Sequence, residues 1–144
     1  VVMGNTLFNA LPLDLVILML GTNDLKHRFA ATPGDIADSI EVLVRAVQRS
    51  EAGPAGAQPA VILVAPTPMQ EVDWLGDMFL GGAEKSRHLA RLIGDVAKRT
   101  GVAFVDAGAS VEASAVDGIH FDSDSHRILG VEMAKAVQGL MGAR

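Results

Sequence analysis

The chain of 144 residues contains no cysteine, which excludes disulfide bonds, thiolate catalysis and cysteine-based zinc sites. It also lacks a long hydrophobic run: LVILML at residues 15–20, which no other run exceeds in length, is far too short to span a bilayer. The basic residues form no cluster and the formal net charge is −5, so nucleic-acid binding is disfavoured. No linker, repeat or low-complexity tract appears. We therefore expect a single domain with neither a nucleic-acid nor a membrane partner.

The sequence does contain enough apolar material for a core, since 49% of its residues are hydrophobic and 20% are charged. The apolar runs at residues 15–20 and 60–65 are typical of strands buried on both faces. The segment VAFVDAG, residues 102–108, predicts a third strand. The segment from Met69 to Gly82 has no clear period and is expected to be irregular, and residues 1–10 hint at a helix.

After each of these strands comes a segment whose apolar residues recur at helical spacing. The first helix should begin at the cap residue Thr32, with Pro33 in its first turn, and end near Arg49. A second should end at residues 100–101, and a third should be capped by Asp122 or Ser123. Alternating strands and helices predict a parallel sheet with helices on both faces.

The strand at residues 15–20 has the composition of a central strand, yet no strand precedes it to lie alongside. An uncovered apolar edge promotes aggregation. We therefore expect one or two strands to be missing on the N-terminal side.

Polar groups follow two of the strands. The segment GTND, residues 21–24, comes directly after the first strand, and DGIH, residues 117–120, follows the third by a loop. Ligands of open parallel sheets bind outside the carboxyl ends of the strands, so both groups should meet at one end of the sheet.

In the first of these segments, Gly21 permits a sharp turn. The Asn23 amide could donate to an oxyanion or merely close a turn, and Asp24 is expected to accept a structural hydrogen bond.

The spacing of Asp117 and His120 suits a general base held by a carboxylate, because Gly118 between them permits a tight turn. The alternative is an Asp-Gly turn that leads into a helix cap. His88 and His126 are expected on the surface. His27 could line the site, although a solvated loop position is favoured.

These two segments resemble blocks of the SGNH (GDSL-type) hydrolase family, whose third block is Gly-x-Asn-Asp and whose fifth is Asp-x-x-His. The surrounding sequence is similar to the small arylesterase/acyltransferase branch across nearly the whole chain. The segments that carry this similarity are LPLDLVILMLGTND, TPGDIA, GGAEKS, VDAG and VDGIHF. The resemblance implies a flavodoxin-like three-layer α/β/α sandwich with a parallel sheet.

The resemblance also implies residue roles. Asn23 would be an oxyanion-hole donor, His120 the general base and Asp117 its orienting acid. Gly21 would belong to the substrate site, and Ile119 would lie against the acyl group. The aromatic residues Trp74 and Phe79 would either shape the pocket or simply pack in the core.

The chain departs from the family in one respect. It contains no Gly-Asp-Ser, the family's first block, which carries the nucleophile, and the second block, which contributes a glycine N–H to the oxyanion hole, is absent too. None of the serines follows a strand in a turn that opens a helix, so none is nominated; they are Ser39, Ser50, Ser86, Ser110, Ser114, Ser123 and Ser125. The missing portion would also supply the first two strands. We interpret residues 1–144 as the C-terminal portion of an SGNH hydrolase-type esterase domain.

The resulting hypothesis is a serine esterase or acyltransferase that acts on small acyl esters in the complete protein, with neither a metal nor an organic cofactor. The 144-residue chain alone is expected to be inactive. The alternative is a non-catalytic binding module that has lost its nucleophile. A nucleotide binder is disfavoured because neither G-x-G-x-x-G nor a Walker lysine motif is present. The resemblance is compatible with a homo-oligomer, and a cytoplasmic location is favoured.

Overall fold

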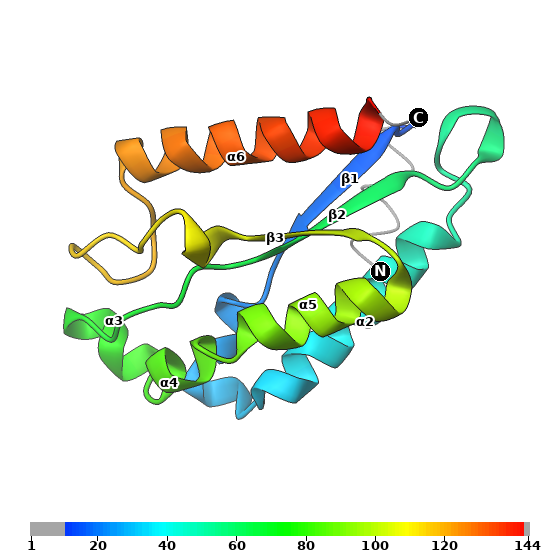
Figure 1. Ribbon diagram of the computed structural model, residues 1–144. Helices are drawn as coiled ribbons and strands as arrows, with labels where there is room; N and C mark the ends of the chain where they lie inside the picture. The colour runs from blue at the N-terminus through cyan, green and yellow to red at the C-terminus, as the bar shows by residue number, and fades with distance from the viewer. Residues whose placement is uncertain (1–10, 143–144) are drawn as a thin grey trace.

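A computed structural model describes residues 11–142 of the protein (Figure 1), so the helix suggested for residues 1–10 lies outside the described part. Strands alternate with helices along the chain, as the sequence predicts. The strands are β1 (Leu15–Met19), β2 (Ala60–Ala65) and β3 (Ala103–Asp106). The helices are α2 (Pro33–Gln48), α3 (Asp73–Met78), α4 (Gly82–Ser86), α5 (Leu89–Thr100) and α6 (Ser123–Met141), with short 3₁₀ turns in several loops.

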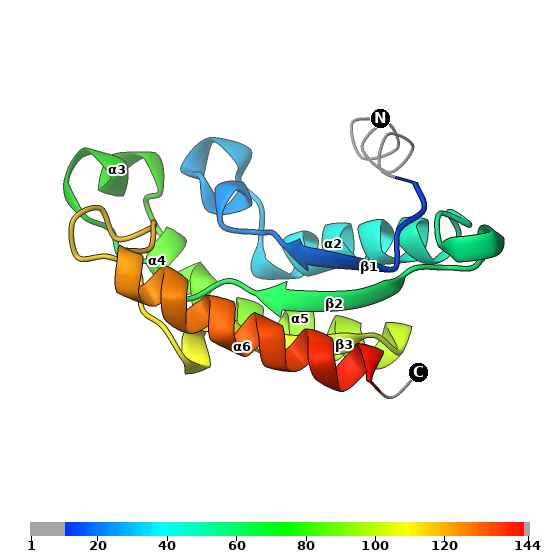
Figure 2. The ribbon, with the colours of Figure 1, turned by 90° about the horizontal axis from the view of Figure 1, so that it is seen from above.

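The three strands form a parallel sheet in the order β1-β2-β3, with Ile17 of β1 opposite Ile62 of β2. Helices α2 and α5 cover one face of the sheet and α6 covers the other (Figures 1 and 2). All residues of β2 are buried, as expected for a central strand covered on both sides. The predicted three-layer α/β/α arrangement with a parallel sheet is confirmed.

Two helices begin where their capping residues predict. Thr32 accepts a hydrogen bond from the Asp35 backbone N–H at 3.1 Å, and the Asp35 carboxylate accepts one from the Thr32 N–H at 2.8 Å. This reciprocal capping box satisfies two N–H groups at the start of α2. Asp122 caps α6 by accepting a hydrogen bond from the Ser125 N–H at 2.7 Å. The start of α6 matters for the site because it directly follows the turn that contains Asp117 and His120.

Each face of the sheet has its own apolar core. Val44 of α2, Leu63 of β2 and Ile93 of α5 belong to the core between the sheet and the two helices. Ile62 of β2 and Leu129 of α6 belong to the smaller core on the opposite face. Within residues 11–142, no helix combines the length and the apolar character needed to cross a membrane.

The expectation that the first strand is buried on both faces is wrong for this chain. β1 lies at an edge of the sheet that the described residues form, and α6 packs on β2 and β3. On the face that α6 covers elsewhere, Ile17 and Met19 are 44% and 42% exposed. The segment from Met69 to Gly82, which was expected to be irregular, contains the short helix α3. This helix lies beyond the carboxyl ends of the strands (Figure 1).

Candidate active site

The segment with Asp117 and His120 is a turn closed by its own backbone. The Ser114 N–H donates to the His120 carbonyl at 2.7 Å, and the Gly118 N–H donates to the Ser114 carbonyl at 2.7 Å. The Gln70 N–H, from the loop that follows β2, donates to the Gly118 carbonyl at 2.8 Å. These bonds fix the turn against the end of the sheet before α6 begins.

Gly118 is required in this turn for two reasons. Its φ of +74° lies in the left-handed region, which side-chain-bearing residues rarely adopt. A Cβ atom at this position would also fall on the backbone carbonyl of Gln70. The close approach of these two backbones therefore depends on a glycine between Asp117 and His120.

Asp117 and His120 form the predicted pair. The Nδ1 atom of His120 lies 2.6 Å from Oδ2 of Asp117. The other carboxylate oxygen accepts hydrogen bonds from the Ile119 and His120 N–H groups, each at 2.9 Å. The bond from the His120 side chain, followed by these two backbone bonds, lowers the pKa of Asp117 to about 2. Asp117 is therefore a carboxylate throughout the neutral range.

An ionised Asp117 assigns the tautomer of His120. A carboxylate is an acceptor only, so Nδ1 carries the hydrogen and donates it, and Nε2 of the neutral ring has a free lone pair. The His120 side chain is 77% exposed, and no side chain within residues 11–142 bonds to Nε2. This arrangement can accept a proton from a hydroxyl group that approaches Nε2.

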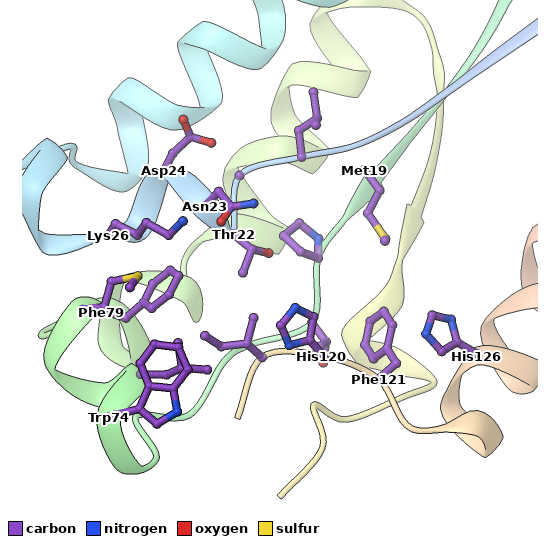
Figure 3. A pocket seen from close by; sticks show the side chains of 17 residues that line it. Met19, Thr22, Asn23, Asp24, Lys26, Trp74, Phe79, His120, Phe121 and His126 are labelled. Atoms are coloured by element: carbon purple, nitrogen blue, oxygen red, sulfur yellow. The ribbon is translucent and has the colours of Figure 1, made fainter. Parts of the chain in front are cut away.

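A cavity of about 560 Å³ opens at the carboxyl ends of the strands and brings the predicted site residues together (Figure 3). His120 and Ile119 line it from the turn at residues 114–120, and Asn23 and Gly21 line it from the loop after β1. Gly21 has a φ of +117°, and a Cβ there would lie 3.2 Å from Ile36, so the sharp turn after β1 needs this glycine. Asn23 then begins the 3₁₀ turn η1 (Asn23–Leu25) with an exposed side chain.

The two aromatic residues, whose roles the sequence left open, differ from one another. Both line the cavity, but Phe79 is 2% exposed and belongs to the core, whereas Trp74 is 67% exposed. Phe79 therefore combines core packing with a place in the cavity wall, while Trp74 stands at the rim (Figure 3).

The remaining histidines mostly follow expectation. His88 is exposed beside Glu84, and His27 is exposed and outside the cavity lining. His126 is exposed as predicted but also lines the cavity, with its ring edge-on to Phe121 at a centroid distance of 5.5 Å. Asp24, expected to accept a structural hydrogen bond, accepts none through its carboxylate from residues 11–142.

Sequence reasoning missed several residues of the cavity. Thr67 follows β2 at the same end of the sheet, and the rule used for the other strands could have found it. Its hydroxyl donates to the Val111 carbonyl at 2.8 Å, so it supports the loop before the turn at residues 114–120. Lys26 and Met19 also line the cavity, and no motif indicated either.

Two kinds of group are missing from the described cavity. No serine lines it, although the threonines Thr22 and Thr67 do. Across residues 11–142, no three His, Asp or Glu side chains converge as a metal site would require. The described cavity thus brings together an imidazole paired with a carboxylate and a side-chain amide, but no serine hydroxyl.

Comparisons with known proteins identify the family of this chain. The model of the GDSL-like lipase/acylhydrolase family matches residues 4–128. The chain belongs to this family. Asn23 and the Asp117–His120 pair all fall within the matched range of the GDSL-like family.

Solved structures similar to this GDSL-like chain include esterases. An aryl esterase from M. smegmatis is 42% identical with a TM-score of 0.89, over 96% of this chain and 66% of that one. A carbohydrate acetylesterase from Sinorhizobium meliloti is 39% identical with a TM-score of 0.90, again over 96% and 66%. A carbohydrate acetylesterase family member from the same organism is 32% identical with a TM-score of 0.90, over 98% and 68%.

The chain thus spans about 66% of the length of the first two of these structures. The comparison with curated proteins gives no match.

Proposed function

We propose that the complete protein is a serine carboxylic ester hydrolase for small acyl esters. The observation that carries this proposal is the Asp117–His120 pair at 2.6 Å, with the exposed His120 side chain lining the same cavity as Asn23. Membership of the GDSL-like lipase/acylhydrolase family supports the same reaction class. The similar structures described as an aryl esterase and a carbohydrate acetylesterase point the same way.

The chemistry follows from the roles that these side chains can take. His120 Nε2 accepts the proton of a serine hydroxyl while the serine oxygen bonds to the acyl carbon. The carbonyl electrons move onto the oxygen, where the Asn23 amide N–H donates to the developing negative charge. When the tetrahedral intermediate collapses, the ester bond breaks and the leaving alkoxide takes the proton from His120. Water repeats the sequence on the acyl-enzyme and releases the acid; an alcohol instead of water would give acyl transfer.

The serine itself is proposed to come from outside these 144 residues. Three observations support this: no serine lines the described cavity, the chain spans about 66% of the length of similar esterase structures, and Ile17 and Met19 on β1 are exposed. The edge of β1 has no partner strand among residues 11–142, and β1 leads straight into the cavity. A further strand beside β1 would cover the apolar edge of the sheet. The same strand could also bring a nucleophile to His120.

The proposal is tested by steady-state hydrolysis of para-nitrophenyl acetate by the complete enzyme and its His120→Ala variant. Loss of a general base is expected to lower kcat by about two to four orders of magnitude. His88→Ala, which removes an exposed histidine between α4 and α5 that does not line the cavity, is the matched control and should retain activity. An unchanged kcat in His120→Ala would overturn the proposal.

The 144-residue chain by itself is proposed to be inactive, because it offers a base without a nucleophile. Robust hydrolysis by this purified chain, blocked by a serine-directed inhibitor, would contradict that part. It would also show that one of the serines within the chain reaches His120.

A further inference from the structure

Lys26 lines the cavity but takes no part in the ester chemistry proposed for His120 and Asn23. It connects the 3₁₀ turns η1 (Asn23–Leu25) and η2 (His27–Phe29), and its backbone N–H donates to the Asn23 carbonyl at 3.3 Å. The main chain therefore places Lys26 one short turn away from the proposed oxyanion donor. Its side chain is half-buried and forms part of the cavity wall.

Phe79 holds the ammonium group of Lys26 at the wall. The Nζ atom lies 5.6 Å from the centroid of the Phe79 ring, within the range of a cation–π contact. The ring belongs to the apolar core and is 2% exposed, so it is a fixed platform. A cation–π contact uses the face of the ring and leaves the N–H donors of the ammonium available to another group.

No group of the described chain takes those donors. Within residues 11–142, the Lys26 ammonium has neither a carboxylate within 4.0 Å nor a hydrogen-bond acceptor, unlike Lys85, which donates to the Ala31 carbonyl at 2.9 Å. The one acidic residue of the cavity lining is Asp24, whose carboxylate points away from Lys26 in Figure 3. The part of the cavity that residues 11–142 form thus presents a positive charge without a paired carboxylate, in a chain whose formal net charge is −5.

The surroundings of Lys26 favour an anion as the group that pairs with it. Trp74, Met78 and Phe79 line the same cavity and make this part of its wall apolar. In such apolar surroundings the attraction between opposite charges is stronger than it is in water. An ester that carries a carboxylate would supply that charge when it binds.

We infer that Lys26 makes the enzyme select esters whose acyl group carries a carboxylate, that is, half-esters of short dicarboxylic acids. This inference rests on the proposed esterase function. The acyl side is chosen because Ile119, the residue expected to lie against the acyl group, packs against the same apolar core as Phe79. Asn23 would bind the oxyanion while Lys26, one turn along, binds the far end of the acyl chain.

The test compares two six-carbon acyl groups on the complete enzyme, para-nitrophenyl hydrogen adipate and para-nitrophenyl hexanoate. The ratio of their kcat/KM values isolates the carboxylate, because the leaving group and the chain length are the same. In Lys26→Met, which keeps a long apolar side chain, the ratio should fall about tenfold, as for the loss of one charged hydrogen bond. Lys26→Arg should keep most of the preference, and added salt should reduce it in the wild type.

Lys98→Met is the control, since it removes a lysine whose side chain is 83% exposed on α5, outside the cavity. Its ratio should equal that of the wild type. A wild-type ratio in Lys26→Met, with hexanoate hydrolysis retained, would overturn the role of Lys26 and leave the esterase proposal intact. Failure of the wild type to hydrolyse hexanoate or acetate esters would overturn both.

A second substrate pair tests which side of the ester carries the charge. The acetates of phenol and of para-hydroxybenzoate differ by a carboxylate on the alcohol side. Their ratio should not depend on Lys26. If Lys26→Met changes this ratio and not the adipate-to-hexanoate ratio, the assignment to the acyl group is wrong.

Discussion

Nδ1 of His120 lies 2.6 Å from Oδ2 of Asp117, and the backbone N–H groups of residues 119 and 120 bind the other carboxylate oxygen at 2.9 Å. One short turn therefore holds both side chains in place. The carboxylate fixes the turn through the backbone and fixes the imidazole through its side chain. These two tasks can be separated by mutation.

Asp117→Asn should preserve the turn and damage catalysis. The asparagine oxygen can still accept both backbone N–H groups, but its NH₂ group would donate to Nδ1 and so favour the wrong imidazole tautomer. We expect kcat of the complete enzyme to fall by roughly three to four orders of magnitude, as for other catalytic acids of this kind. Circular dichroism should show an unchanged fold. A kcat equal to that of the wild type would argue against an orienting role.

The pH dependence of stability should carry the signature of Asp117. Its pKa is lowered from 3.8 to about 2, so the folded state favours the carboxylate. The stabilisation is therefore complete above the unfolded pKa of 3.8 and is lost as the pH falls toward about 2. Urea midpoints of the wild type and Asp117→Asn should differ by a constant amount above about pH 5 and converge below about pH 4. Convergence near neutral pH would point to a different titrating group.

Asn23→Ala should affect the chemical step. Removal of one oxyanion donor lowers kcat by about two to three orders of magnitude while changing KM little. Gln58→Ala is a suitable control, because it removes an exposed amide from a loop outside the cavity. A rise in KM at constant kcat would assign Asn23 to ground-state binding instead.

Gly118→Ala should destabilise the fold and the site together. The residue has a φ of +74°, and an added Cβ would meet the Gln70 carbonyl, so we expect a loss of about 1 kcal/mol or more in the free energy of unfolding. Gly130→Ala is the matched control, because a Cβ atom added there on α6 would have no neighbour within 4 Å. At that position the same substitution should stabilise by about 0.5–1 kcal/mol, as expected inside a helix. Equal effects at the two positions would contradict the close backbone contact.

Several elements were predictable because their signals are local. The capping residues Thr32 and Asp35 fixed the start of α2, and an uninterrupted apolar run fixed β2. The Asp117–His120 pair was also predictable, since the two residues are only three positions apart and Gly118 between them permits the tight turn. In each case the determining contacts lie close together in the sequence.

Other features depend on distant parts of the chain. The exposure of Ile17 and Met19 reflects which strands α6 covers, and the apolar composition of β1 does not contain that information. The different positions of Trp74 and Phe79 likewise depend on how the segment around α3 folds over the end of the sheet. No sequence motif indicated Lys26, because the ring that it contacts belongs to Phe79, which is far away in the sequence.

The central claim is that His120 serves a serine outside these 144 residues. The most direct measurement treats the complete enzyme with diisopropyl fluorophosphate and locates the adduct by peptide mass spectrometry. The adduct should map to one serine that lies outside residues 1–144, and its rate of formation should drop sharply in His120→Ala. An adduct on any of the serines within these 144 residues, or labelling that ignores His120, would contradict the claim.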